Sequence, residues 1–343
     1  MGTSFPQLRI PQTLEEATSA SWLSTVLGAE VTRVFPGEVD NRVSTNLPLR
    51  VELADGSSRD LWIKGYFTEI GRQYRFGGVA EAAFYRDLVE RTGVRTLRPV
   101  AAAVDFESSE NVVVTEDELG SGARFLHALD PFTPDQAARS LKELATLHAA
   151  TWMDPELRDT PWLANRCHLY TVTRGVEEIR TNFDGPIGAG VPDVVRDATR
   201  LFETYRVLGD RIGSASPWSV IHGDPHIGNI CVDGAGDPFL VDWQLVQRGP
   251  WYIDVGYHIA SVLTVEDRRQ AESDLLQHYL EQLGTRGIQI PARDVWPGIR
   301  LGMLHGFYLW AITLKVDPRK TAVLLERLGT AVADHNAFDE IGA

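Results

Sequence analysis

A short β-like patch at residues 219–242 interrupts a long part of the chain that otherwise has helical periodicity. Apolar residues lead into His222-Gly223-Asp224, and two more apolar runs flank an Asp/Gly-rich turn at residues 233–237. Apolar runs separated by such a turn predict a β-hairpin. Asp242 follows the second run directly. We therefore expect the fold to bring two carboxylates, those of Asp224 and Asp242, close together.

The segments before and after this patch differ in their periodicity. The first third is predicted to contain an opening helix at residues 14–27, a second helix at residues 80–90 and strand-like runs at residues 30–35, 49–53, 59–66, 100–105 and 111–114. Later helices are predicted from Thr133 onward and at residues 171–183, 192–211, 265–283, 296–314 and 319–335. The pattern predicts an α+β fold with a β-rich N-lobe at residues 1–116 and a larger, mainly helical C-lobe at residues 117–343.

The composition is that of an ordinary soluble globular protein. Of the 343 residues, 43% are apolar and 23% are charged. No run of about 18 apolar residues is present, so we expect no membrane span. Residues 1–6 lack a basic region followed by an apolar one, so we expect no secretory signal. Two cysteines, Cys167 and Cys231, cannot form a disulfide framework and fit a reducing, cytoplasmic location.

The net charge of −14 disfavours nucleic acid as a partner. An acidic surface can attract a cationic substrate, and it can also serve solubility alone. Any phosphate site in this chain must therefore rely on local cations and a metal ion.

The residues around Asp224 contain the parts that phosphoryl transfer from ATP requires. Such transfer needs a carboxylate beside the attacking hydroxyl, oxygen ligands for Mg²⁺ and a positioned cation for the phosphates. Asn229 lies five residues after Asp224, the separation found in the kinase catalytic loop. One loop can then aim Asp224 at a hydroxyl while Asn229 and Asp242 hold Mg²⁺. Each residue alone could be an ordinary turn or cap residue, but the set in this order indicates a catalytic centre.

Lys64 is the candidate cation, at the end of an alternating strand. Glu81 opens the helix that follows and is its expected partner, with Glu69 as the alternative. The segment at residues 37–42, which includes Asn41, could cover the phosphates with backbone N–H groups or could be a plain turn.

Two histidines and one further acid surround the predicted loop. His222 and His226 have a spacing that could bind zinc on a helix, but Pro225 and the neighbouring glycines favour a loop. We interpret His222 as structural and His226 as a residue of the active-site lining. Asp254 either braces the catalytic loop or is an ordinary first-turn acid of the next helix.

Together these motifs resemble the aminoglycoside phosphotransferase and choline kinase-like superfamily. The matching segments are His222-Gly223-Asp224…Asn229, Val241-Asp242-Trp243-Gln244 and Gly249…Asp254-Val255-Gly256-Tyr257. Four features look most like the ecdysteroid kinase-like branch. They are the Asp242-Trp243-Gln244 form of the second segment, Trp22-Leu23, Glu81…Phe84-Tyr85 and residues 147–152. The similarity runs from about residue 13 to residue 335.

The resemblance implies a protein kinase-like bilobal fold that uses ATP and Mg²⁺. It implies Asp224 as base, Asn229 and Asp242 as metal ligands, and Lys64 as phosphate clamp. It also implies an adenine-binding hinge at residues 112–119, which contains Glu116. The segment at residues 37–42 lacks the richer glycine pattern of many members.

The leading hypothesis is a cytoplasmic ATP-dependent kinase, monomeric or homodimeric, for a hydroxyl-bearing small molecule. Its acceptor pocket is expected to draw on aromatic residues and histidines of the C-lobe, namely Trp152, Trp162, His226, Trp251, Tyr252, His305 and Tyr308. A nucleotide-binding pseudokinase that regulates a partner is the alternative. A protein kinase is disfavoured because no activation segment follows Asp242.

Overall fold

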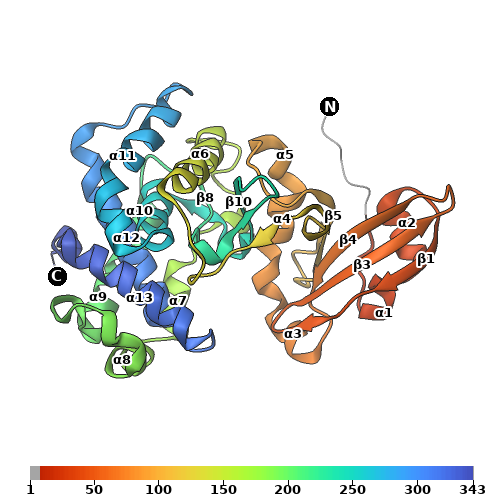
Figure 1. Ribbon diagram of the computed structural model, residues 1–343, viewed down its shortest axis with the longest axis horizontal. Helices are drawn as coiled ribbons and strands as arrows, with labels where there is room; N and C mark the ends of the chain where they lie inside the picture. Colours follow the sequence, from red (N-terminus) through yellow and green to blue (C-terminus); the bar gives the residue numbers. More distant parts are fainter. Residues whose placement is uncertain (1–7, 343) are drawn as a thin grey trace. The chain divides into compact units, whose positions relative to one another are not determined.

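The computed structural model describes residues 8–342, which form two compact units (Figure 1). The first unit runs to Arg124 and also contains Val241–Leu245. The second contains Phe125–Leu240 and the chain from Val246 onward. Residues 1–6, on which the expectation of no secretory signal rests, lie outside the described part of the chain.

The first unit is built on an antiparallel sheet of six strands. In the order β1-β3-β4-β6-β5, with β2 pairing with β3, they are β1 (Val31–Pro36), β3 (Thr45–Leu53), β4 (Ser58–Gly65), β6 (Asn111–Glu116), β5 (Pro99–Val104) and β2 (Asp40–Asn41). Lys64 lies in the central strand β4, where it pairs with Asn46 on one side and Val113 on the other.

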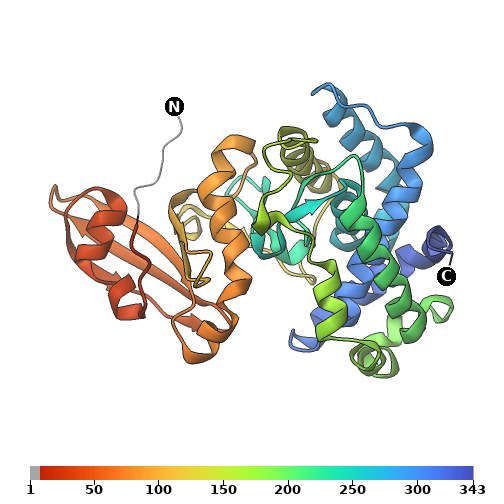
Figure 2. The ribbon, with the colours of Figure 1, turned by 180° about the vertical axis from the view of Figure 1, so that it is seen from behind.

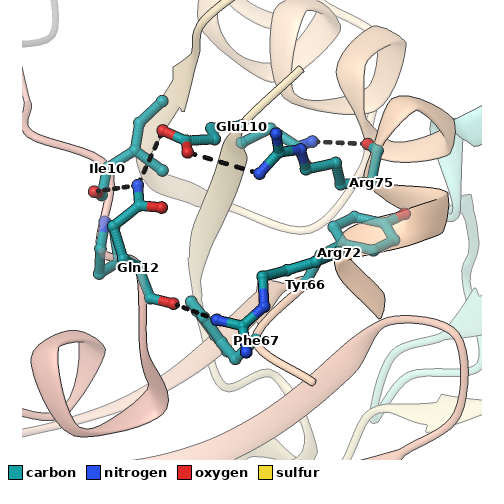
Figure 3. A pocket seen from close by; sticks show the side chains of 9 residues that line it. Ile10, Gln12, Tyr66, Phe67, Arg72, Arg75 and Glu110 are labelled. Atoms are coloured by element: carbon teal, nitrogen blue, oxygen red, sulfur yellow. Dashed lines mark hydrogen bonds and ion pairs between the residues drawn. The ribbon is translucent and has the colours of Figure 1, made fainter. Parts of the chain in front are cut away.

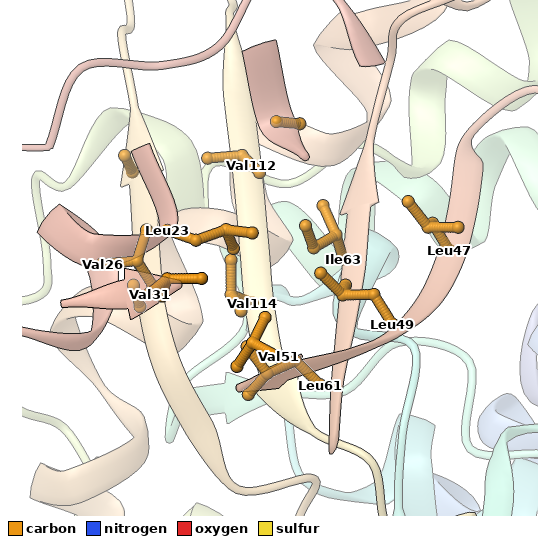
Figure 4. Packing of buried hydrophobic residues seen from close by; sticks show 13 residues of the cluster. Leu23, Val26, Val31, Leu47, Leu49, Val51, Leu61, Ile63, Val112 and Val114 are labelled. Carbon is orange, nitrogen blue, oxygen red and sulfur yellow. The ribbon is translucent and has the colours of Figure 1, made fainter. Parts of the chain in front are cut away.

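One face of this sheet carries an apolar core beneath two short helices, α1 (Leu14–Ala17) and α2 (Ala20–Leu27) (Figure 4). Ile63 and its neighbours at every second strand position point into this core. Because strand side chains alternate between faces, Lys64 lies on the opposite face.

Two predicted helices of the first unit are each divided in two. The segment at residues 14–27 breaks because the Ser19 hydroxyl accepts the Trp22 N–H and caps α2. The segment at residues 80–90 forms α4 (Val79–Asp87) and α5 (Val89–Thr92), separated at Leu88. A further short helix, α3 (Glu69–Tyr74), precedes them.

The second unit is mainly helical, as predicted. Its helices are α6 (Pro134–Ala150), α7 (Cys167–Thr173), α8 (Val176–Asp184), α9 (Ala198–Ser214), α10 (Tyr252–Val262), α11 (Val265–Gly284), α12 (Ala292–Ala311) and α13 (Pro318–Asp334). Helices α10 and α12 lie side by side in both ribbon views (Figures 1 and 2). Among the described residues, no helix is both long and apolar enough to cross a membrane.

Helix caps explain where the predicted boundaries were wrong. The helix predicted at residues 171–183 is divided into α7 and α8 because Arg174 is extended and the Gly175 N–H donates to the Glu178 carboxylate, which caps α8. The helix predicted at residues 192–211 begins only at Ala198, because the Asp197 side chain accepts the Arg200 N–H.

The hairpin predicted inside this helical unit is confirmed. Strands β9 (Ile230–Val232) and β10 (Pro238–Leu240) pair antiparallel, and the Asp233 carboxylate accepts the N–H groups of Ala235 and Asp237 in the turn. The other edge of β9 carries the two-residue strand β7 (Arg124–Phe125). Strand β8 (Ser219–Ile221) pairs with β11 (Gln247–Gly249) and leads into the Asp224 loop.

The core of the first unit yields a stability prediction. Ile63 is fully buried in it, so Ile63→Ala should lower the free energy of unfolding by about 2–5 kcal/mol. The matched change Ile63→Val should cost only about 0.5–1.5 kcal/mol. Urea unfolding measures both values, and equal effects of the two substitutions would contradict this packing.

Candidate active site

Lys64 is the centre of a charged cluster in the first unit. Its Nζ lies 2.7 Å from Glu81 Oε2 and 3.2 Å from Asp242 Oδ1. Lys64 and Glu81 are largely buried, whereas the Asp242 side chain is 43% exposed. The expected partner of Lys64 is thus in contact with it, while the alternative, Glu69, lies in the first turn of α3.

The electrostatics of this cluster keep Lys64 charged. Burial acts to lower the pKa of Lys64, but the charges of Asp242 and Glu81 outweigh it and raise that pKa. Glu81 also receives a hydrogen bond from the backbone N–H of Trp243. Glu81 therefore links the strand lysine to the segment that carries Asp242.

Asp242 is fixed by the residue that follows it. Its backbone is left-handed, with φ of 62°, a conformation that non-glycine residues seldom adopt. Trp243 is fully buried, stacks on Phe84 with ring centroids 3.9 Å apart, and donates from Nε1 to Thr96 Oγ1 at 2.9 Å. The indole thus ties Asp242 to α4 and to the loop before β5.

The two other residues predicted to bind nucleotide have partners within the sheet. Asn41 Oδ1 accepts the Thr45 hydroxyl at 2.8 Å, and Glu116 forms an ion pair with Arg59. The segment at residues 37–44 contains the short strand β2 and a turn in which the Arg42 N–H bonds the Ser44 carbonyl. Nucleotide binding by Asn41 and Glu116 stays a prediction.

A small cavity of the first unit is too small for a cofactor (Figure 3). Its volume of about 20 Å³ is enough for one water molecule. Its charged lining is already paired: Glu110 accepts from Gln12 Nε2 at 2.7 Å and lies 3.4 Å from Arg75 Nη1.

The Asp224 loop lies in the second unit. Asp224 Oδ1 accepts the Tyr257 hydroxyl at 2.9 Å, and Oδ2 lies 3.2 Å from Asn229 Nδ2. The same Asn229 nitrogen donates to the Asp224 carbonyl at 2.8 Å. Because Asn229 uses its nitrogen in both bonds, neither of them involves its amide oxygen, which can accept from another partner.

His226 also faces Asp224. Its Nδ1 accepts the Gly228 N–H at 2.9 Å, which places the ring proton on Nε2. Nε2 lies 3.5 Å from Asp224 Oδ2, so a neutral His226 presents its N–H to the carboxylate.

Asp254 lies in the first turn of α10 and is fully buried. Its carboxylate accepts the backbone N–H groups of His222 at 2.7 Å and Gly223 at 2.8 Å, and lies 3.1 Å from His148 Nε2. Burial acts to raise the pKa of Asp254, but the hydrogen bond and charge of His148, with the His222 charge and the Gly223 N–H, hold it below its ordinary value. Asp254 therefore remains a carboxylate under the loop.

Two buried histidines hold the carbonyls on either side of Asp224. His305 Nε2 lies 2.9 Å from the Gly223 oxygen, and His258 Nδ1 lies 2.6 Å from the Pro225 oxygen. Burial lowers the pKa of both rings, that of His258 to about 4. His258 was not among the predicted site residues, because a histidine on an apolar helix face gives no sign of its distant partner.

The aromatic residues predicted for the acceptor pocket differ in exposure. Trp251 is buried against Tyr279, and Tyr308 is buried against Tyr205 with ring centroids 3.7 Å apart. Trp152, Trp162 and Tyr252 are half-buried. Their part in acceptor binding stays a prediction.

Comparisons with known proteins bear on the family and the fold of the chain. Residues 72–291 match the family model described as the phosphotransferase enzyme family. A Ralstonia eutropha JMP134 structure named as an aminoglycoside phosphotransferase has a TM-score of 0.56 at 13% identity, covering 94% of this chain and 96% of that one. This likeness confirms the predicted α+β, protein kinase-like fold.

Two further solved structures are similar at lower TM-scores. Choline kinase LicA of Streptococcus pneumoniae has a TM-score of 0.47 at 16% identity, covering 92% of this chain and 96% of that one. An ethanolamine kinase of Plasmodium vivax has a TM-score of 0.49 at 14% identity, covering 87% and 82%. No curated protein matches the sequence.

Removing the charge under the loop should destabilise the second unit. Asp254→Asn replaces an acceptor of three N–H groups by an amide whose own N–H groups would face donors, so we expect a loss of about 3–5 kcal/mol. Asp210→Asn, at an exposed position, is the control and should change stability by less than about 0.5 kcal/mol. Urea denaturation of both variants measures this, and similar midpoints would contradict the bracing role.

His258 should make the protein less stable in mild acid. As the pH falls from about 6.5 to about 4, the unfolded chain binds a proton that the buried ring does not. The free energy of unfolding therefore decreases across this window, by at most about 3 kcal/mol. His258→Asn keeps a donor for Pro225 and should show a smaller loss between pH 7 and pH 5 in urea titrations. An unchanged loss would exclude His258 as the source.

Proposed function

Because the chain belongs to the phosphotransferase enzyme family, we propose that it transfers the γ-phosphoryl group of ATP to a hydroxyl group of a small molecule. The observation that carries this proposal is the Asp224 carboxylate, held by Tyr257, Asn229 and His226 on a loop braced by Asp254. A carboxylate fixed in this way can orient an acceptor hydroxyl and receive its proton as the new bond forms.

Lys64 is the proposed phosphate clamp. It is charged, and Glu81 holds it in place at 2.7 Å. A buried ammonium has three N–H donors, so beside the bonds to Glu81 and Asp242 it can present a remaining N–H group to a phosphate oxygen. This role requires little else from the first unit, because phosphoryl transfer depends mainly on positioning and on neutralising charge.

Asn229 and Asp242 have the chemistry of Mg²⁺ ligands. Each offers a hard oxygen, from an amide and a half-exposed carboxylate. Within the described residues there is no group of three or more His, Cys, Asp or Glu side chains able to hold a metal, which fits an ion that takes its other ligands from phosphates and water. When bound, Mg²⁺ neutralises charge on the phosphate oxygens.

For the acceptor we propose only its chemical class, a small molecule with a hydroxyl group.

Within the family we propose that the chain belongs to the ecdysteroid kinase-like branch, because its motif has the form Asp242-Trp243-Gln244. A cytoplasmic location is supported by the low cysteine content, since the sequence has only Cys167 and Cys231.

The test is ADP release with ATP, Mg²⁺ and a library of hydroxyl compounds. A productive acceptor should stimulate turnover, and Asp224→Asn should reduce it by at least about a hundredfold. Lys64→Met should also reduce turnover, through loss of phosphate positioning. Asp210→Asn should match the wild type.

A different set of results would contradict the proposed reaction. If ATP binds, no compound stimulates turnover and Asp224→Asn changes nothing, the protein is a nucleotide-binding regulator and the proposed reaction is wrong.

A further inference from the structure

The shortest side-chain hydrogen bond to the Asp224 carboxylate comes from Tyr257 on α10, which was not among the predicted site residues. The Tyr257 hydroxyl lies 2.9 Å from Asp224 Oδ1. The same hydroxyl accepts the indole N–H of Trp310, on α12, at 2.7 Å. Both aromatic side chains are buried.

The chemistry of these groups gives the chain of bonds one direction. An indole nitrogen can only donate, and an ionised carboxylate can only accept. The Tyr257 oxygen therefore accepts from Trp310, and its single proton must go to Asp224. Burial and the charge of Asp224 raise the pKa of Tyr257 well above its ordinary value, which keeps the hydroxyl protonated. Hydrogen bonds in such a chain strengthen one another.

Glycines on α10 and α12 fix the position of the Tyr257 ring. A Cβ atom at Gly306 would lie 2.2 Å from Tyr257 Cδ2, so the ring rests directly on the α12 backbone. A Cβ atom at Gly256 would lie 2.2 Å from the Ile299 carbonyl oxygen. The helices can approach this closely only because both positions lack side chains.

We propose that Tyr257 is a positioning residue for Asp224: its hydroxyl, oriented by Trp310, holds the carboxylate in one orientation and so directs its remaining lone pairs at the acceptor hydroxyl. The proposal rests on the proposed function of Asp224. It adds that α12, through Gly306 and Trp310, sets the geometry of the base.

The hydrogen-bond chain itself can be tested without any acceptor. In protein labelled with ¹³C at tyrosine Cζ, the Tyr257 resonance is the one lost in Tyr257→Phe. We expect that resonance to shift in Asp224→Asn, which replaces the charged acceptor by a neutral amide, and in Trp310→Phe, which removes the indole donor. It should not shift in Asp210→Asn. If the chemical shift of the Tyr257 resonance is unchanged in both Asp224→Asn and Trp310→Phe, the proposal is wrong.

The consequence for catalysis is tested in acceptor-dependent ADP release. Tyr257→Phe keeps the ring and removes the hydroxyl, and should lower kcat about tenfold to a hundredfold while leaving the KM for ATP unchanged. Gly306→Ala keeps the hydroxyl but displaces the ring, and should give the same pattern. Asp210→Asn, at an exposed position, is the control and should leave kcat unchanged.

The two arms separate this inference from the proposed reaction. If no hydroxyl compound is phosphorylated by the wild type, the reaction is wrong and the labelling experiment still decides whether the chain of bonds exists. If the wild type is active and Tyr257→Phe has the same kcat, the positioning role is wrong. If Tyr257→Phe does not fold, the kcat of Trp310→Phe decides in its place, with a decrease at constant KM for ATP expected.

Discussion

Asp254 is a charge with no contact to solvent, and a buried carboxylate is tolerated only where hydrogen bonds replace its lost water. The backbone N–H groups of His222 and Gly223 and the ring of His148 supply those bonds. The Tyr279 hydroxyl, 2.7 Å from His148 Nδ1, extends the network to α11. The same bonds that satisfy the charge hold the backbone of the two residues before Asp224, so the position of the loop depends on the solvation of Asp254. Helices α6, α10 and α11 all contribute to that solvation.

The charged cluster of the first unit is positioned by strand alternation and apolar packing. Lys64 reaches the face of the sheet away from the α1–α2 core by strand alternation alone, and Glu81 is placed by the first turn of α4. Asp242 joins them because the chain leaves the second unit for Val241–Leu245 and because Trp243 is buried against Phe84. Apolar packing thus positions a carboxylate whose own side chain stays partly exposed.

Local patterns in the sequence were enough to predict the hairpin, the place of Asp242 directly after it and the contact of Lys64 with Glu81. Each of these features depends on residues close in the chain or on strand alternation. The helix starts at Ser19, Gly175 and Asp197 were not predicted. The apolar pattern continues through each of them, and a single side-chain hydrogen bond to the backbone sets where the helix begins. Tyr257, His258 and His305 form their bonds to Asp224 and its neighbours across long stretches of chain. Their sequence signal is that of ordinary core residues, so only the fold reveals the contacts.

The left-handed backbone of Asp242 has a consequence for how this segment can vary. Such a conformation costs a non-glycine residue on the order of 1 kcal/mol, and glycine would adopt it without strain. A chain under selection for stability alone would therefore drift toward glycine at this position. In Asp242 the contact of the carboxylate with Lys64 and the packing of Trp243 against Phe84 offset that strain. Asp242→Gly would relax the backbone here and remove a carboxylate from the Lys64 cluster.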